Sequence, residues 1–220
     1  MRDCATTLEP EVTEAELKAL TSLLENSQFD GLHLEIGTAA GGTLKAMMGV
    51  YADSVRPDFV VVDPMTYFPD QRQIVDTNLQ SAGLDPAKVD FRTGKSWTVF
   101  QEAERDGEKF AFVFIDGNHK AKYVIQDLCW SRLLEPGGCL CLHDYCSEHK
   151  GVIWAVDRFL SRNPAYERVD LVDTLMILKK NENSEHSEIG FMDRLIGRGL
   201  SFIHSQERSI KKRLNKRVPS

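Results

Sequence analysis

The chain of 220 residues contains 42% hydrophobic and 27% charged residues, a composition typical of a globular protein that can bury one substantial core. Its net charge of −6 argues against a broad nucleic-acid surface, which would need an excess of Lys and Arg. No apolar run approaches the ~18 residues of a membrane-spanning helix, and no signal-peptide pattern follows Met1, so we expect a cytoplasmic protein. The odd count of five cysteines favours free thiols over disulfides.

Residues 1–31 are predicted to form an N-terminal helical segment. Thr13 and Glu16 have the spacing of a capping box, in which each side chain bonds the backbone amide of the other residue. Four leucines follow on one helical stripe, at positions 17, 20, 23 and 24. We therefore expect a helix that covers the core and ends near Gly31.

Residues 32–183 show strands that alternate with helices. Apolar runs predict strands at 32–36, 59–62, 89–92, 110–115 and 139–142. Helical spacing follows at 44–48, 71–82, 98–105, 121–134 and 152–162. A hairpin at 168–172 and 175–179 would add an antiparallel edge. The pattern predicts an α/β fold with a Rossmann-like, mostly parallel seven-stranded sheet and helices on both faces.

Residues 184–220 are predicted to form a basic, amphipathic C-terminal tail. Its apolar residues have helical spacing: Phe191, Leu195, Ile196, Leu200 and Ile203. Eight Lys and Arg against four acids give the tail a charge of +4, which leaves −10 on the rest of the chain. Three interpretations stay open: a solvated helix, a subunit contact in a homodimer, and peripheral contact with the inner face of the membrane.

Ligands of parallel α/β sheets bind beyond the carboxyl ends of the strands. After the first strand, a loop with Gly37, Thr38 and Gly41 lets the backbone approach a ligand, and Glu35 places a carboxylate beside it. After the second, Asp63 can accept the hydroxyls of a ribose. The loop lacks the G-x-G-x-x-G pattern that binds a dinucleotide pyrophosphate, and an acidic loop suits S-adenosylmethionine (SAM) better than NAD.

The other three strand ends are also polar. Ser96 and Trp97 follow the third strand and offer a hydroxyl and a ring to an adenine. Asp116 and His119 follow the fourth strand, and His143-Asp144 follow the fifth. The alternative interpretation is structural, because strand-end carboxylates often cap backbone amides and His119 could cap the next helix. The histidines and cysteines near 139–149 lack the paired spacing of a structural zinc site.

Three stretches together resemble class I SAM-dependent methyltransferases: residues 34–43, 114–119 and 134–145. More narrowly, they resemble the branch found in sugar and natural-product gene clusters, which is related to catechol O-methyltransferase. The resemblance covers about residues 32–180. It implies that Glu35, Gly37 and Gly41 lie at the methionine end of SAM, with Thr38 and Asp116 also binding the cofactor. It further implies that Asp63 binds the ribose and that Ser96 and Trp97 border the adenine.

The resemblance also implies a catalytic site and a metal. Asp116, His143 and Asp144 occupy the positions that hold Mg²⁺ in the catechol-type enzymes, and His119 occupies the position of the base. His143 departs from the family, whose members usually have an oxygen ligand there. Imidazole is a poor ligand for Mg²⁺, so Mg²⁺, another divalent cation and no metal all stay open.

The sequence therefore predicts a SAM-dependent O-methyltransferase acting on a small molecule. By resemblance a sugar or polyol hydroxyl is the first choice of acceptor, a phenolic hydroxyl the second and an amine the third. The alternatives are a noncatalytic nucleotide- or SAM-binding module and, more remotely, an NAD-dependent oxidoreductase. The titratable residues Asp116, His119 and Asp144 favour an enzyme, because a binding module does not need such groups.

Overall fold

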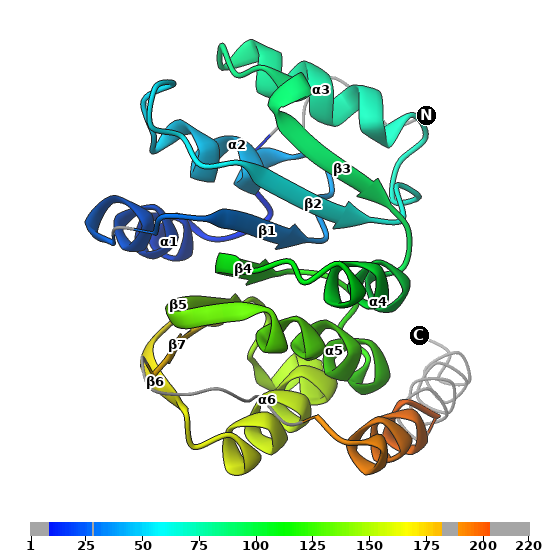
Figure 1. Ribbon diagram of the computed structural model, residues 1–220. Coiled ribbons are helices and arrows are strands. Elements are labelled where there is room, and N and C mark those ends of the chain that lie inside the picture. Colours follow the sequence, from blue (N-terminus) through cyan, green and yellow to red (C-terminus); the bar gives the residue numbers. More distant parts are fainter. Residues whose placement is uncertain (1–8, 28, 182–188, 203–220) are drawn as a thin grey trace, which may run out of the picture.

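The computed structural model describes residues 9–27, 29–181 and 189–202, and a seven-stranded sheet forms its centre (Figure 1). The strands are β1 (Leu32–Ile36), β2 (Phe59–Asp63), β3 (Val89–Thr93), β4 (Phe110–Ile115), β5 (Leu134–Leu142), β6 (Tyr166–Val172) and β7 (Leu175–Lys180). The main helices are α1 (Glu14–Asn26), α2 (Gly42–Gly49), α3 (Gln71–Ser81), α4 (Ser96–Arg105), α5 (Ala121–Asp127) and α6 (Lys150–Arg162).

The strand order is β3-β2-β1-β4-β5-β7-β6. Strands β1 to β5 are parallel to one another, and β7 pairs antiparallel with both β5 and β6. The hairpin turn is Asp173-Thr174, as predicted, and Asp173 adopts a positive φ of 49°. The order reverses between β1 and β4, which places the switch point of the sheet where Rossmann-like folds bind ligands.

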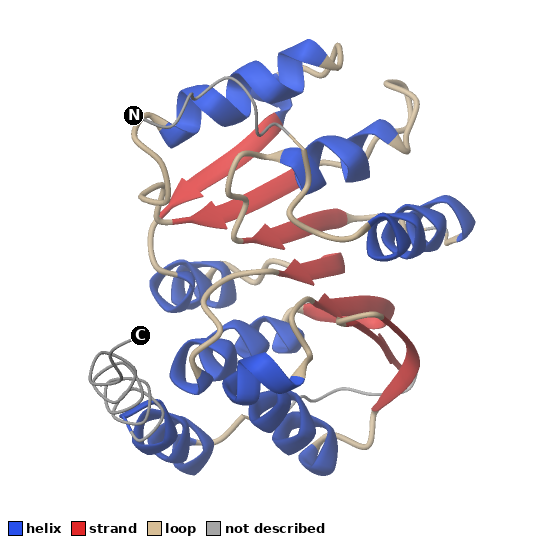
Figure 2. Ribbon diagram, turned by 180° about the vertical axis from the view of Figure 1, so that it is seen from behind, coloured by secondary structure: helices blue, strands red, loops and turns tan. Residues whose placement is uncertain are grey.

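Helices cover both faces of the sheet (Figure 2). Successive strand residues point to opposite faces, so the apolar strands present side chains to both helical layers. On one face, Leu34, Val60 and Val113 pack with residues of α4, α5 and α6. On the other, Phe59 and Phe112 pack with residues of α1, α2 and α3. The predicted fold is confirmed: both faces of these strands are apolar because each has a helical layer to meet.

The predicted capping box opens helix α1. The Thr13 hydroxyl accepts a hydrogen bond from the Glu16 amide at 3.2 Å, and the Glu16 carboxylate accepts one from the Thr13 amide at 2.8 Å. Leu20 and Leu24 of this helix are buried against the sheet. The helix ends at Asn26, several residues before the predicted Gly31.

The segment between β4 and β5 departs from the prediction of one helix over 121–134. Helix α5 ends at Asp127, and a 3-10 helix, Leu128–Arg132, continues the chain. Strand β5 begins at Leu134, before the predicted 139–142, because Leu134 pairs with Phe110 and the next pair is Cys139 with Phe112. The turn at Pro136–Gly138 therefore lies inside the strand as an irregularity. Periodicity could not detect this long-range pairing.

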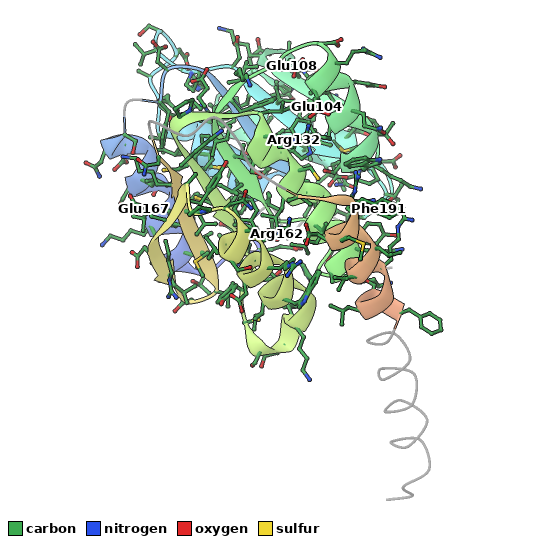
Figure 3. All side chains as sticks on the ribbon, turned by 60° about the horizontal axis from the view of Figure 1, so that its bottom comes forward. Glu104, Glu108, Arg132, Arg162, Glu167 and Phe191 are labelled. Atoms are coloured by element: carbon green, nitrogen blue, oxygen red, sulfur yellow. The ribbon has the colours of Figure 1, made fainter. Side chains whose placement is uncertain are left out.

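The part of the predicted tail that the structure describes is packed on the domain. Residues 191–202 are helical (Figure 3), while the basic positions from Arg208 onward lie outside the described residues. Asp193 of this helix is buried and pairs with Arg158 of α6 at 2.8 Å. Among the described helices, none is both long and apolar enough to cross a membrane. The four cysteines within the described residues are free thiols.

Candidate functional site

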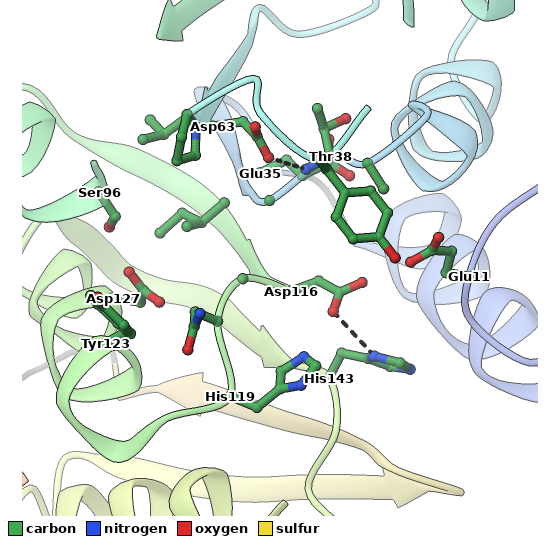
Figure 4. Close-up of a pocket in the computed structure, with 18 of the residues that line it drawn as sticks. Glu11, Glu35, Thr38, Asp63, Ser96, Asp116, His119, Tyr123, Asp127 and His143 are labelled. Atoms are coloured by element: carbon green, nitrogen blue, oxygen red, sulfur yellow. Dashed lines mark hydrogen bonds and ion pairs between the residues drawn. The ribbon is translucent and has the colours of Figure 1, made fainter. Parts of the chain in front are cut away.

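A cavity of about 990 Å³ lies at the carboxyl ends of the parallel strands (Figure 4). Its wall includes nine of the predicted site residues: Glu35, Gly37, Thr38, Asp63, Ser96, Asp116, His119, His143 and Asp144. Two others, Gly41 and Trp97, do not line it. Most of the residues predicted from their positions after the strands therefore line one cavity.

The glycine loop after β1 allows two backbone segments to meet. Gly37 has a φ of +84°, and a Cβ placed there would collide with the backbone carbonyl of Asp116. Gly41 has a φ of +80°, and its Cβ would lie only 2.9 Å from Val75 of α3. Gly37 therefore shapes the cavity, whereas Gly41 serves the turn into α2 and the packing against α3.

Glu35 at the end of β1 is a buried carboxylate that faces the cavity. Among the described residues its polar neighbour is the Thr38 side chain, and no hydrogen bond of good geometry reaches either oxygen. Burial raises the pKa of Glu35 to about 8; the Thr38 side chain opposes this rise, and the charges of Asp116 and Asp63 add to it. A buried polar group without a partner is costly, so this position fits a ligand that brings a hydrogen-bond donor or a positive charge.

Asp63 at the end of β2 is held by three neighbours. Its Oδ2 accepts the Thr38 amide at 3.1 Å, and its Oδ1 accepts the Met65 amide at 2.5 Å and the Gln71 side-chain amide at 3.3 Å. These bonds fix the carboxylate between the loops that follow β1 and β2. The carboxylate lines the cavity, where it can accept the hydroxyls of a bound sugar.

Asp127 is a cavity residue that the sequence did not single out. It lies at the end of α5, is buried, and accepts a hydrogen bond from the Ser96 hydroxyl. Burial raises the pKa of this carboxyl to about 7. The Ser96 oxygen in turn accepts the indole N–H of Trp130 at 2.9 Å. Figure 4 shows Asp127 between Ser96 and Tyr123, pointing into the cavity.

Trp97 lies in a different environment from the one predicted. Its ring stacks on Phe100 at a centroid distance of 5.6 Å, and the guanidinium of Arg194 lies 4.8 Å above it. Helix α4 turns consecutive residues in different directions, so Ser96 faces the cavity while Trp97 packs on the apolar core. The prediction that Trp97 borders an adenine therefore finds no support in its position.

His143 is enclosed by carboxylates. Its Nδ1 lies 3.2 Å from Asp116 Oδ1 and 3.4 Å from Asp144 Oδ2, and its Nε2 lies 3.1 Å from Glu16 Oε2. Burial alone would lower the pKa of His143, but the bonds and charges of Asp116 and Asp144 outweigh it and raise the pKa to about 11. Carboxylate oxygens only accept, so both ring nitrogens are donors and the imidazole is a fixed cation.

The ligand atoms of Asp116, His143 and Asp144 lie within 4.8 Å of one another, close enough to share a metal ion, but a protonated His143 ring competes with a metal for this place. An imidazole that donates from both nitrogens has no lone pair for a metal, and its positive charge lies between Asp116 and Asp144. In the catechol-type pattern those carboxylates would neutralise a bound cation. Here the imidazolium performs that neutralisation within the protein.

His119 is held by Asp144 at the mouth of the cavity. Its Nε2 lies 2.7 Å from Asp144 Oδ2, and the centroids of the His119 and His149 rings are 4.2 Å apart. The hydrogen bond to Asp144 raises the pKa of His119, although burial opposes this. Asp144 has a φ of +62°, a strained conformation for a residue with a side chain. Since Nε2–H donates to Asp144, Nδ1 is the nitrogen that can take a proton.

The N-terminal segment contributes residues that strand-end reasoning missed. Glu9 and Glu11 line the cavity, and the charge of Asp116 helps burial to raise the pKa of Glu11. Glu16 bonds His143 as well as its own helix cap. The capping-box pattern already explained Glu16 as a cap of its own helix, so nothing in the sequence indicated its contact with His143.

Comparisons with known proteins agree with this geometry. Residues 34–145, half of the chain, match a family model described as a methyltransferase domain. Among curated protein sequences, none matches the chain.

Several solved structures share the fold. An O-methyltransferase from Bacillus cereus in complex with S-adenosylhomocysteine is 19% identical, with a TM-score of 0.62, over 78% of this chain and 82% of that one. The O-methyltransferase TomG from Streptomyces achromogenes, in complex with SAM, is 18% identical, with a TM-score of 0.59, over 77% and 81%. CalS11, a TDP-rhamnose 3'-O-methyltransferase of calicheamicin biosynthesis, is 17% identical, with a TM-score of 0.56, over 74% and 76%. At these identities the likeness establishes the fold.

Proposed function

The chain belongs to the methyltransferase-domain family, and from that premise we propose that it transfers the methyl group of SAM to a hydroxyl group of a small molecule. The observation that carries this proposal is Glu35, whose buried carboxylate lines the cavity with no well-formed hydrogen bond among the described residues. The amino group of the methionine end of SAM supplies the positive charge and the N–H donors that this carboxylate lacks.

The rest of the cavity suits the other parts of SAM. Asp63 is fixed where it can accept ribose hydroxyls, and Ser96 with Asp127 forms a polar wall for the adenine edge. The wall carries seven carboxyl groups against the cations of Lys95, Lys120 and His143, so it is acidic on balance. An acidic wall attracts a sulfonium and repels the pyrophosphate of NAD, which favours SAM over a dinucleotide.

SAM supplies a methyl carbon bonded to a sulfonium, and transfer proceeds by in-line displacement with S-adenosylhomocysteine as the product. The chain positions the acceptor hydroxyl and removes its proton. Nδ1 of His119 takes the proton as the hydroxyl oxygen bonds the methyl carbon, and Asp144 stabilises the resulting imidazolium. The His143 imidazolium offsets the negative charge of Asp116 and Asp144 beside the reacting oxygen.

We propose a sugar or polyol as the acceptor. The mouth of the cavity offers the carboxylates of Glu11 and Asp116 as hydrogen-bond acceptors for several hydroxyls. The fold likeness to CalS11, described as a TDP-rhamnose methyltransferase, points in the same direction. A phenolic acceptor is the second choice.

Calorimetry tests the cofactor assignment. We expect S-adenosylhomocysteine to bind and NAD not to bind. Asp63→Ala should weaken binding by about 1–3 kcal/mol, the cost of leaving a ligand hydroxyl unpaired, whereas Asp30→Ala, at an exposed aspartate outside the cavity, should not. Equal binding by wild type and Asp63→Ala would refute the ribose assignment, and binding of NAD would refute the proposal.

A further inference from the structure

The helix at residues 191–202 has its apolar side turned outward. Phe191 and Phe202 are 68% and 65% exposed, and Met192, Leu195 and Ile196 are also exposed. Asp193, Gly197 and Ser201 face inward and are buried. Figure 3 shows Phe191 on this helix at the side of the domain. The usual arrangement of an amphipathic surface helix is therefore inverted.

Specific contacts hold the helix in this orientation. Asp193 accepts hydrogen bonds from Arg158 at 2.8 Å and from the Gly190 amide at 2.9 Å. At the other end, the Ser201 hydroxyl accepts the backbone amide of Lys122 at 2.9 Å. A Cβ at Gly197 would lie 3.4 Å from the Ala121 carbonyl, so the helix packs closely on α5. Turning the apolar side inward would break these bonds and bury large side chains where only small ones fit.

The sequence from this helix to residue 220 is basic. From residue 191 to residue 220 the sequence contains eight Lys and Arg and only two acids, Asp193 and Glu207. Asp193 is already paired within the domain. An exposed apolar helix side joined to a basic sequence matches the surface of an acidic phospholipid bilayer, which has anionic headgroups above an apolar interior.

We propose that residues 191–202, with the basic residues that follow, bind the surface of an anionic phospholipid bilayer. The apolar side chains enter the boundary between headgroups and acyl chains, and the basic residues meet the lipid phosphates. A symmetric dimer through the same face suits it less well, because a two-fold contact would bring two strongly cationic segments together. A contiguous apolar face of this kind marks an interaction site, unlike scattered exposed residues.

Vesicle co-sedimentation of the full chain tests the proposal. We expect binding to vesicles of phosphatidylcholine with phosphatidylglycerol, weaker binding to phosphatidylcholine alone, and loss of binding as salt rises. Phe191→Ser with Leu195→Ser should weaken binding about tenfold or more, because two apolar side chains then no longer leave water. A matched control, Val55→Ser with Val169→Ser, removes two other exposed apolar side chains and should bind as wild type does.

A charge variant gives an independent measurement. Lys211→Gln with Lys212→Gln leaves the described helix untouched and should reduce both binding and its salt dependence. Binding that is absent, or that the Phe191 and Leu195 variant leaves unchanged, overturns the proposal. Light scattering without vesicles gives a further test. If the wild-type chain is a dimer there and the Phe191 and Leu195 variant is a monomer, the proposal is also overturned, because a second copy of the chain would then cover the apolar side.

Discussion

The Nε2 atom of His143 lies 3.1 Å from the Glu16 carboxylate, so the imidazole at the end of β5 is held by the N-terminal helix. The same carboxylate accepts the Thr174 amide at 2.8 Å and the Thr174 hydroxyl at 2.7 Å. Glu16 thereby ties α1, the end of β5 and the hairpin turn together. The N-terminal segment, predicted as a helical segment that covers the core, also contributes Glu9 and Glu11 to the wall of the cavity.

Glu16→Ala should lower the free energy of unfolding by ~3 kcal/mol, because it leaves the His143 cation and the Thr174 donors without their partner. Burial raises the pKa of Glu16, but the bonds from Thr13, Thr174 and His143 outweigh it and lower the pKa to about 2. The folded pKa is depressed, so this stability is present above pH ~4.5 and is lost as pH falls towards 2. Urea unfolding measures it. Glu14→Ala, at an exposed acid of the same helix turn, is the control, and an equal loss there would contradict the assignment.

His119→Gln should reduce turnover by about 10²–10⁴-fold, the range for losing a general base, with S-adenosylhomocysteine affinity unchanged. The base works only when neutral, and the bond to Asp144 raises its pKa, so the acid limb of the pH–rate profile should lie above pH ~6.5. Asp144→Asn removes the charge and should move that limb to lower pH. A profile that neither substitution alters would exclude His119 as the base.

Chelation with EDTA should leave methyl transfer intact, because the His143 cation already lies between the carboxylates that would hold a metal. Calorimetry should detect no Mg²⁺ binding to the wild-type chain. His143→Asp replaces the cation by an oxygen ligand and should create Mg²⁺ affinity at the same place. If EDTA abolished activity and added Mg²⁺ restored it, His143 would have to release Asp116 and Asp144 to a metal, which would contradict this prediction.

Asp127 should select adenine. Its carboxylate can accept the exocyclic amino group, so S-adenosylhomocysteine should bind about tenfold or more tightly than S-inosylhomocysteine, which carries an oxygen there. Asp127→Asn supplies a donor to that oxygen and should reduce the preference. Ser96→Ala, which removes a partner of Asp127 but keeps the carboxylate, should retain it. Equal affinities in the wild-type chain would contradict this role.

A chain ending at residue 183 should still bind S-adenosylhomocysteine, since no residue of 189–202 lines the cavity. It should lose about 1–3 kcal/mol of unfolding free energy, because Arg158 and the Lys122 amide lose Asp193 and Ser201 as partners. A chain ending at residue 202 keeps those contacts and should match the full chain. Equal urea midpoints for both truncations would show that the helix contributes nothing to the domain.

Local patterns were enough for the sheet and for most of the cavity. The order of strands and helices follows from hydrophobic periodicity, and parallel strands must end at one edge, which brought Glu35, Asp63 and Asp116 together without knowledge of any distance. The glycine requirement at Gly37 was also visible, although its cause, the Asp116 carbonyl, was not.

Only the tertiary structure decided which side chains meet across the chain. Glu16 and His143 are 127 positions apart, and no periodicity reports such a contact. Tertiary packing placed the half-buried Trp97 against the core and turned Asp127 towards the cavity, which depends on how each helix is rotated on the sheet. The tail shows the same limit: its sequence indicates an amphipathic helix, but Asp193 and Ser201, through their partners on α6 and α5, determine that the apolar side faces outward.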